Sequence, residues 1–310
     1  MSKLIRRQVI TAKVESSYNT DAVPTGPADA IEVEDLSWQT EGLRMVERPL
    51  IRSSLATVKQ LYGGSLLGVS FSCEVKGSGS AGVAPDMGAL LLGCAMAETI
   101  VASTSVTYLP ASSSLSSLTI YIYEDGTLIK MTGCAGQPVL AAEVGGRMMI
   151  AFSFIGHFSG PTDISLVTPT YDSTVPLIFI NGAFDIGGFA AVIQALSVDW
   201  GNVIQTPDNF NAADGYGEVR VTGRDVNGSF NPEQPLVASK DFMSIFKAGT
   251  EEALDTGALG ATAGNIVRIQ LPKISYRNIA PEQREGVLAY GLPFGAAEDS
   301  GDDEASIEFT

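Results

Sequence analysis

Hydrophobic and polar residues alternate in many short stretches of the chain, and this period of two predicts β-strands with one buried face. Residues 31–34 and 67–76 show the alternation most simply. Within 118–132, two such stretches flank Asp125-Gly126, and Asp-Gly is a favoured turn between paired strands. Further strands are predicted over residues 148–156, 191–200, 217–222, 266–276 and 286–290.

Two segments have helical character instead. Residues 86–97 are apolar and interrupted by glycine, and Pro85 suits the first turn of a short helix there. Within 240–248, apolar residues such as Phe242 and Ile245 recur at helical spacing. The pattern therefore predicts a mainly β protein with two short helices.

Long connections separate several of these elements. Residues 41–66 form a connection too long for an ordinary turn, and loops of that size inside compact domains usually contact a partner or carry function. The Ser/Thr-rich segment 103–117 is predicted to be a connector, and 157–175 is a candidate interdomain linker. Residues 201–217 are predicted to form a second loop.

Residues 175–196 are apolar enough, with Asp185 as their single charge, to have the length of a membrane helix. Pro176 and Asn181-Gly182 argue against a helix, because Asn-Gly between apolar runs is a hairpin signal. Two buried strands are the preferred interpretation.

The same order of features occurs twice along the chain. An apolar strand ends at a tryptophan, a proline-containing loop follows, and then come an alternating strand, glycines, a Pro-acidic pair and an apolar helical stretch. The matching features are Leu36-Ser37-Trp38 with 196–200, Pro49 with Pro207, Val69–Val75 with Val219–Val221, and Pro85-Asp86 with Pro232-Glu233. Both tryptophans lie in apolar strand patterns, so we expect both in the core.

The two copies lie about 150 residues apart, which is near the size of one domain. We therefore predict two tandem β-sandwich domains, each with a short flanking α-helix. The first is 1–175, with an N-terminal arm and the long loop 41–66, and the second is 176–310, with an acidic C-terminal tail. An alternative place for the boundary is 182–190.

Composition narrows the possible functions. The chain has 310 residues, of which 45% are hydrophobic, and this suffices for two buried cores. The formal net charge is −16 and the pI is about 4.4. This charge argues against tight nucleic-acid binding, which needs Lys and Arg to neutralise phosphates, and against an anionic membrane surface.

Cysteines and the N-terminus add little. Cys73, Cys94 and Cys134 form no C-x-x-C pair and are expected to be free, mostly buried thiols. The basic residues 1–7 lack a following apolar segment, so no signal peptide is predicted.

Candidate chemistry is sparse. Residues 77–82 match G-x-G-x-x-G, but Pro85 delays any helix, so a flexible loop is favoured over a dinucleotide site. His157 is the only histidine and is interpreted as a polar residue at a strand end, because one histidine cannot make a zinc site. The acidic residues 298–304 lack the alternation and central glycine of a calcium loop. We therefore predict no catalytic residue, cofactor or metal, and a protein that is not an enzyme.

Three segments carry a resemblance to a known family: 13–39, 117–136 and 195–233. They resemble the major tail (tail tube) protein of long, non-contractile-tailed bacteriophages. The segments cover less than half of the chain and occur in the same order along it.

The resemblance implies a structural virion protein that self-assembles into stacked rings, with inner sheets joined into one β-lined channel. Two tube domains in one chain imply trimers that imitate a six-fold ring. It also implies tape measure, tail terminator and tail-tip proteins as partners, and double-stranded DNA that passes through the lumen without specific binding. The protein is expected in the virion tail, made in the bacterial host cytoplasm, with no membrane partner. A net negative charge suits a lumen along which DNA slides.

The resemblance further implies that the loop 41–66 reaches a neighbouring subunit and that 201–217 is its shorter counterpart in the second domain. The predicted inter-subunit residues are Arg44, Glu47, Arg48, Arg52, Lys59, Asp208, Asn209 and Asp214. We also expect 41–66 and the polar tail 298–310 to be mobile in the free subunit and to order on stacking. Alternatively, Ser306–Phe309 pairs onto a strand edge.

Other functions remain open from the sequence. A capsid decoration protein or a tube subunit of a contractile injection system has a similar β-rich, acidic composition. A carbohydrate-binding β-sandwich would need exposed aromatic platforms, and the chain has only two tryptophans. An enzyme of unknown chemistry has no positive support.

Overall fold

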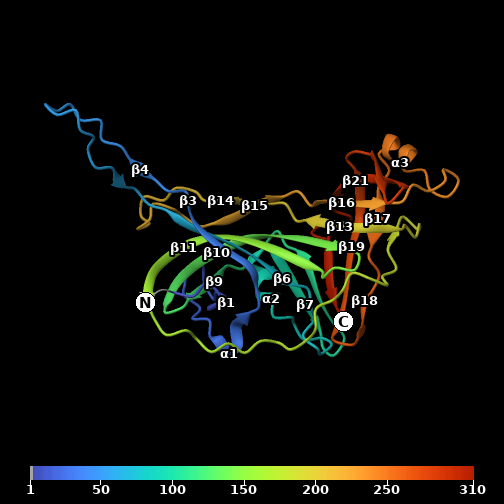
Figure 1. The fold of residues 1–310 in the computed structure, drawn as a ribbon, viewed down its shortest axis with the longest axis horizontal. Helices are drawn as coiled ribbons and strands as arrows, with labels where there is room; N and C mark the ends of the chain where they lie inside the picture. The colour runs from blue at the N-terminus through green and yellow to red at the C-terminus, as the bar shows by residue number, and fades with distance from the viewer. Residues whose placement is uncertain (1–2) are drawn as a thin grey trace.

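The computed structural model describes residues 3–310 and is built from antiparallel strands with three short helices (Figure 1), which confirms the mainly β prediction. The helices are α1 (Gly26–Asp29), α2 (Gly88–Gly93) and α3 (Phe242–Ala248). The strands before the midpoint of the chain are β1 (Gln8–Val14), β2 (Ala30–Ile31), β3 (Glu34–Glu41), β4 (Met45–Val46), β5 (Leu61–Tyr62), β6 (Leu66–Glu74), β7 (Met96–Val101), β8 (Ser105–Pro110), β9 (Leu118–Glu124), β10 (Thr127–Glu143) and β11 (Met149–Asp163). Those that follow are β12 (Asp185–Ile186), β13 (Ile193–Asp199), β14 (Asn202–Gln205), β15 (Arg220–Arg224), β16 (Asn227–Pro232), β17 (Glu252–Asp255), β18 (Leu259–Thr262), β19 (Asn265–Tyr276), β20 (Ala280–Arg284), β21 (Val287–Ala297) and β22 (Ser306–Phe309).

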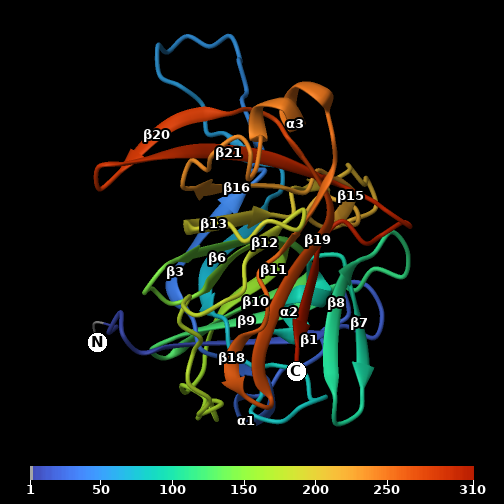
Figure 2. The same cartoon turned by 90° about the vertical axis from the view of Figure 1, so that its right-hand side faces the viewer.

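One antiparallel sheet runs through both halves of the chain. Its strand order is β3-β6-β11-β10-β13-β16-β21-β20, and every neighbouring pair is antiparallel. Figure 2 shows the part from the second half, where β20, β21, β16 and β13 lie side by side. We call this set of strands the joined sheet. The link between the halves is the pairing of β10 with β13.

A second layer covers one face of the joined sheet. It contains β1 and β9, which pair with each other, and the β7–β8 hairpin, which pairs with β22. Leu90 and Leu91 of α2 are fully buried between the layers. Phe71, Phe152 and Phe154 stack with ring centroids 6.0–6.1 Å apart. Burial of such apolar faces at about 25 cal/mol per Å² is the main stabilising contribution to the fold.

The doubled sequence pattern corresponds to a doubled strand arrangement. In the first half Ser37 lies opposite Ser70, and in the second half Ser197 lies opposite Ser229. A leucine precedes the first serine of each pair and a phenylalanine follows the second. A third strand then extends both ladders, β11 beside β6 and β21 beside β16.

Local sequence signals account for several elements. The Asp125-Gly126 turn joins β9 to β10 with both residues at positive φ, as the predicted hairpin requires. Helix α3 starts at the cap Asp241, whose carboxylate accepts a hydrogen bond from Ser244 N, and ends at Gly249 in the left-handed conformation. The predictions of this hairpin and of the helices near 86–97 and 240–248 are confirmed.

The hairpin predicted at Asn181-Gly182 is wrong. Residues 175–192 are irregular apart from the short β12, and Leu177 and Phe179 are buried in the core between other strands. The apolar run therefore fills the core without regular pairing. No helix within residues 3–310 is long and apolar enough to cross a membrane.

Several segments predicted to be irregular contain strands. β11 continues to Asp163 within the candidate linker 157–175, and β14 lies within the predicted loop 201–217. The Ser/Thr-rich connector 103–117 includes β8, because its alternating valine, tyrosine and proline side chains are buried. The expectation of a mobile tail over 298–310 is wrong for its last part, because β22 pairs with both β19 and β8 and its Ile307 and Phe309 are buried. The alternative, in which Ser306–Phe309 pairs with a strand edge, holds within the chain itself.

The tryptophans differ. Trp200 is 1% exposed, as expected for the core, but Trp38 is 41% exposed, so its predicted core position is wrong. Trp38 lies on β3, which pairs only with β6 within the described residues, so one edge of the strand is open. Its indole Nε1 donates to Glu124 Oε1 at 2.8 Å.

Replacing Ile307 by alanine tests whether β22 is a structural strand. Ile307 is fully buried between two strands, so the change should lower the free energy of unfolding by about 2–5 kcal/mol. Urea denaturation measures this. Glu308→Ala, at the next and more exposed position, should cost less than about 1 kcal/mol. Equal, small effects at both positions would show that the tail is dispensable.

Candidate assembly interface

Residues 42–64 project from the body of the molecule as a two-stranded arm (Figure 1). Its strands β4 and β5 pair through Met45 with Tyr62 and Val46 with Leu61. Residues 47–60 beyond this pairing are irregular and almost entirely exposed. The predicted long connection is therefore a protruding feature, which we call the arm.

The arm has the surface chemistry of a binding element. Ile51 and Leu55 are as exposed as in an extended chain, at 103% and 107%. Fully exposed large apolar side chains on a protruding segment usually mark an interaction site. Five of the predicted inter-subunit residues lie on the arm, namely Arg44, Glu47, Arg48, Arg52 and Lys59. The arm is therefore apolar and mostly basic within a strongly acidic chain.

A clamp at the base of the arm holds it against the second half of the chain. The guanidinium of Arg44 lies 3.9 Å from the ring centroid of Tyr216, and its Nε donates to the Tyr216 hydroxyl at 2.9 Å. Arg44 also forms an ion pair with Asp208, and the Tyr216 hydroxyl donates to the carbonyl of Gly42. At Gly64, with φ +116°, a Cβ would lie 1.9 Å from the Asp214 carbonyl oxygen, so only glycine fits.

The structure thus brings Arg44, Asp208 and Asp214 together and leaves the other arm residues apart from them. Asn209 lies in the same loop, where its backbone N–H donates to Gly215 O at 3.0 Å. Tyr216 was missed, because nothing in the sequence distinguishes this tyrosine from the others.

His157 is a second residue whose role the sequence did not indicate. It is buried in β11, and its Nδ1 lies 2.5 Å from a carboxylate oxygen of Asp214. Its Nε2 lies 3.0 Å from the Tyr18 hydroxyl and 3.1 Å from Gly217 O. The Tyr18 hydroxyl in turn accepts from Val219 N at 2.7 Å. The imidazole therefore links the N-terminal segment, the joined sheet and the loop of the second half.

Burial and hydrogen bonding act in opposite directions on Asp214. Partial desolvation raises the pKa of its carboxyl group, but hydrogen bonds from His157 and the Tyr216 backbone N–H outweigh this, so the net pKa is lowered. Burial raises the pKa of Tyr18 to about 12, which keeps its hydroxyl protonated. The charged carboxylate is therefore the form that the loop stabilises.

A ribbon formed by β14 and β15 attaches the second half to the first. Tyr216 and Val219, just before β15, pack with Leu66 and Ala135 of the first half in a separate buried cluster. Ile155 of β11 packs against the same cluster. The ribbon thus lies on the face of the joined sheet that the second layer leaves uncovered.

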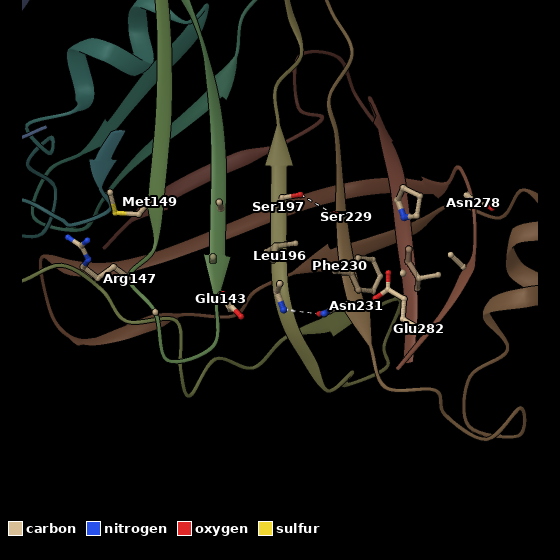
Figure 3. Close-up of a pocket in the computed structure, with 18 residues that line it drawn as sticks. Glu143, Arg147, Met149, Leu196, Ser197, Ser229, Phe230, Asn231, Asn278 and Glu282 are labelled. Carbon is tan, nitrogen blue, oxygen red and sulfur yellow. Dashed lines mark hydrogen bonds between the residues drawn. The ribbon is translucent and has the colours of Figure 1, made fainter. Parts of the chain in front are cut away.

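The rest of that uncovered face, which we call the open face, is lined by small and polar side chains. Figure 3 shows its strands from both halves side by side, with Ser197 and Ser229 linked at 3.1 Å. A shallow groove of about 720 Å³ crosses the β10–β13 joint and includes Ala141, Glu143 and Glu282. At one end, Arg147 is held by ion pairs to Glu34 and Glu74. Within residues 3–310 no cluster of three or more His, Cys, Asp or Glu side chains is arranged to hold a metal ion.

The joined sheet ends in two unpaired strand edges. Within residues 3–310, β3 pairs only with β6, and β20 pairs only with β21. Unpaired edges present free backbone N–H and C=O groups that can template pairing with another chain. These edges, the arm and the open face are the surfaces available for assembly.

The sequence of this chain matches a model of a known protein family. The family model described as phage tail tube protein matches residues 5–310, nearly the whole chain. No curated protein matches the sequence.

Replacing Asp214 by asparagine tests the His157 link. A carboxyl group with a lowered folded-state pKa contributes stability above its unfolded pKa and loses it as the pH falls through the folded value. Asp214→Asn should therefore lower stability at pH 7 by about 1 kcal/mol and weaken the decline in stability on acidification. Urea midpoints between pH 7 and pH 3 measure both effects. The control Asp163→Asn changes an exposed carboxylate at the end of β11 and should leave the profile unaltered.

Proposed function

Because the chain belongs to the phage tail tube protein family, it is a structural component of the virion tail whose copies assemble into a tube, and we propose that three copies close each ring. The observation that carries this proposal is the joined sheet, which repeats one strand arrangement in both halves of the chain. Two equivalent units per chain and three chains give a ring that imitates six-fold symmetry. In this proposal residues 1–175 and 176–310 are two tube domains, although β22 crosses over to pair with β8.

The open face of the joined sheet lines the channel in this proposal. Ser70, Gln137 and Ser153 continue the small, polar character of the groove across the first half. Glu41, Glu143 and Glu282 add negative charge to the face. Small side chains leave the lumen smooth, and carboxylates repel the phosphates of a passing duplex, so double-stranded DNA slides through without specific binding. The tube then conducts the genome into the host.

The arm makes the contact between stacked rings. Its exposed apolar and basic side chains suit an acidic surface with apolar patches. Another copy of the chain, with a net charge of −16, provides an acidic surface. The clamp formed by Arg44 and Tyr216 fixes the direction in which the arm leaves the ring. The shorter counterpart, residues 201–217, packs against the first half of its own chain through Ile204 and Tyr216, and its Phe210 is fully exposed. The longer arm therefore contributes more to stacking.

Three further partners belong to this proposal. A tape measure protein occupies the lumen before the genome does, a tail terminator closes the upper end, and tail-tip proteins supply the first ring. Synthesis takes place in the cytoplasm of the bacterial host, and assembly needs no membrane.

Electron microscopy of the concentrated protein tests ring symmetry. We expect hollow tubes whose averaged rings contain three chains and six similar densities. True six-chain rings would keep the tube and contradict the trimer. A protein that stays monomeric even when supplied with a tail-tip complex would contradict the proposed assembly.

Shortening the arm tests its role in stacking. Val46 and Leu61 face each other, so replacing residues 47–60 by Asn-Gly closes a two-residue hairpin without disturbing the clamp. The variant should keep the wild-type unfolding midpoint and lose tube formation, as measured by sedimentation and microscopy. The matched variant Arg48→Ala with Arg52→Ala keeps the arm but removes two of its charges. It should weaken assembly most at low ionic strength, where ion pairs are screened least. Tubes of normal length from the shortened variant would refute the proposal.

A further inference from the structure

We infer that β20 of one copy pairs with β3 of the next copy, in the register that β10 and β13 use within a single chain. The inference rests on the proposed ring and specifies which backbone edges close it. Its template is a contact that the structure contains.

The template is the joint between the two halves. Strands β10 and β13 pair antiparallel, with Val139 opposite Asp199, Ala141 opposite Ser197 and Glu143 opposite Ala195. Backbone hydrogen bonds flank this register, from Val144 N to Gln194 O at 2.8 Å and from Trp200 N to Pro138 O at 3.3 Å. The joint is therefore a regular strand pair that extends the sheet from one half to the other.

Strand β3 is the first-half counterpart of β13. Leu36-Ser37 corresponds to Leu196-Ser197, and in both cases the serine lies opposite a serine of the following strand. Both strands also contain a register shift just before this serine. The edge of β13 is covered by β10, whereas the edge of β3 is open.

Strand β20 is the second-half counterpart of the end of β10. Ser70 lies opposite Ser153 and Ser229 opposite Pro293, which aligns β11 with β21. In that alignment the partner of Ala151, Val139, corresponds to the partner of Gly291, Ala280. Ala141 corresponds to Glu282 in the same way.

The correspondence fixes the register between copies. The predicted cross-chain pairs are Ala280 with Gln39, Pro281 with Trp38, Glu282 with Ser37 and Arg284 with Asp35. The last pair places Asp35 beside Arg284, whose guanidinium also pairs with Glu233 within its own chain at 2.7 Å. The second pair covers Trp38, which is 41% exposed, whereas Val198 at the equivalent position is fully buried. The next copy thus covers the side chain of Trp38 that is exposed in the single chain.

Pro281 affects this strand pair in two ways. Proline has no N–H, so the edge of β20 lacks one donor, and prolines on edge strands discourage indiscriminate pairing. Its ring lies opposite the indole of Trp38 in the predicted register. We therefore assign to Pro281 both a protective role in the free subunit and a packing role in the ring.

A second contact supports the same neighbour. Within the chain, the β14–β15 ribbon that follows β13 packs against Leu66, Ala135 and Ile155 on the first half of the joined sheet. The arm that follows β3 is its counterpart, and it has no such surface within its own chain beyond the clamp. The second half of the copy that pairs with β3 provides that surface to the base of the arm.

Cysteine cross-linking of assembled tubes tests the register. Side chains of directly opposite residues on one face lie close enough for a disulfide, so Ser37→Cys with Glu282→Cys should link copies on oxidation. The native Cys73, Cys94 and Cys134 are buried, and burial raises the pKa of their thiols, so they do not interfere. Non-reducing gels should show covalent dimers and trimers, with at least about five-fold more cross-linked product than the control below.

Two matched variants calibrate the result. Ala141→Cys with Ser197→Cys places the pair at the internal template and should close a disulfide within one chain. Ser37→Cys with Gln283→Cys moves one thiol to the adjacent position, whose side chain points to the opposite face, and should remain uncross-linked. As an independent measurement, tryptophan emission should shift to shorter wavelength on assembly of the wild type, and not of Trp38→Phe.

The possible outcomes distinguish the strand register from the tube function. Tubes that form without cross-links at Ser37 and Glu282, while the internal pair closes, would overturn the register and leave the tube function intact. A wild-type chain that forms no tubes, with or without a tail-tip complex, would overturn both. If the Ser37→Cys, Glu282→Cys variant does not assemble, Gln39→Cys with Ala280→Cys is tested instead. If neither variant assembles while Ala141→Cys with Ser197→Cys does, the substituted edges lie at the interface between copies.

Discussion

Backbone hydrogen bonding along the edges of one antiparallel sheet is the constraint on which the rest of this structure depends. Every strand in the interior of the joined sheet has a partner on both sides, and the β10–β13 pair carries the sheet across the middle of the chain. The second layer, the core phenylalanines and the short helices all pack against this continuous support. Within residues 3–310 the joined sheet has its unpaired edges at β3 and β20, and in the ring that we propose each of them pairs with a neighbouring copy.

The two faces of the sheet serve different purposes. The covered face carries large apolar side chains such as Phe152 and Phe230, whose burial stabilises the subunit. The open face carries serine, alanine and glutamate, which add little to stability and leave a smooth acidic surface. Polar clusters are placed where segments distant in sequence meet: His157 joins Tyr18 to Asp214, and Arg44 fixes the arm to Tyr216. Electrostatic contacts thus position the assembly elements, while hydrophobic contacts build the body.

Sequence patterns predicted those parts whose signals are local. The Asp-Gly turn of β9–β10, the alternation of β6 and the capped helix α3 are all decided by neighbouring residues. The candidate interface was predicted as two loops with eight named residues, but the contacts between those loops were not. That Arg44 and Asp208 form an ion pair depends on segments more than 160 residues apart, and no spacing rule reports such a contact. Asn181-Gly182 misled for the same reason, because its flanking apolar residues are used to fill the core rather than to pair with each other.

By itself, the sequence determined that the chain is a mainly β, acidic protein with a repeated strand motif, because alternation, turn residues and charge are properties of short segments. Only the tertiary structure decided that the two repeats share one sheet, that the C-terminal segment is a buried strand, and that Trp38 is exposed where Trp200 is buried. The physical reason is that strand pairing satisfies hydrogen bonds between residues far apart in the chain. Similar local patterns therefore have different surroundings, because β13 has β10 as a neighbouring strand and β3 has an open edge.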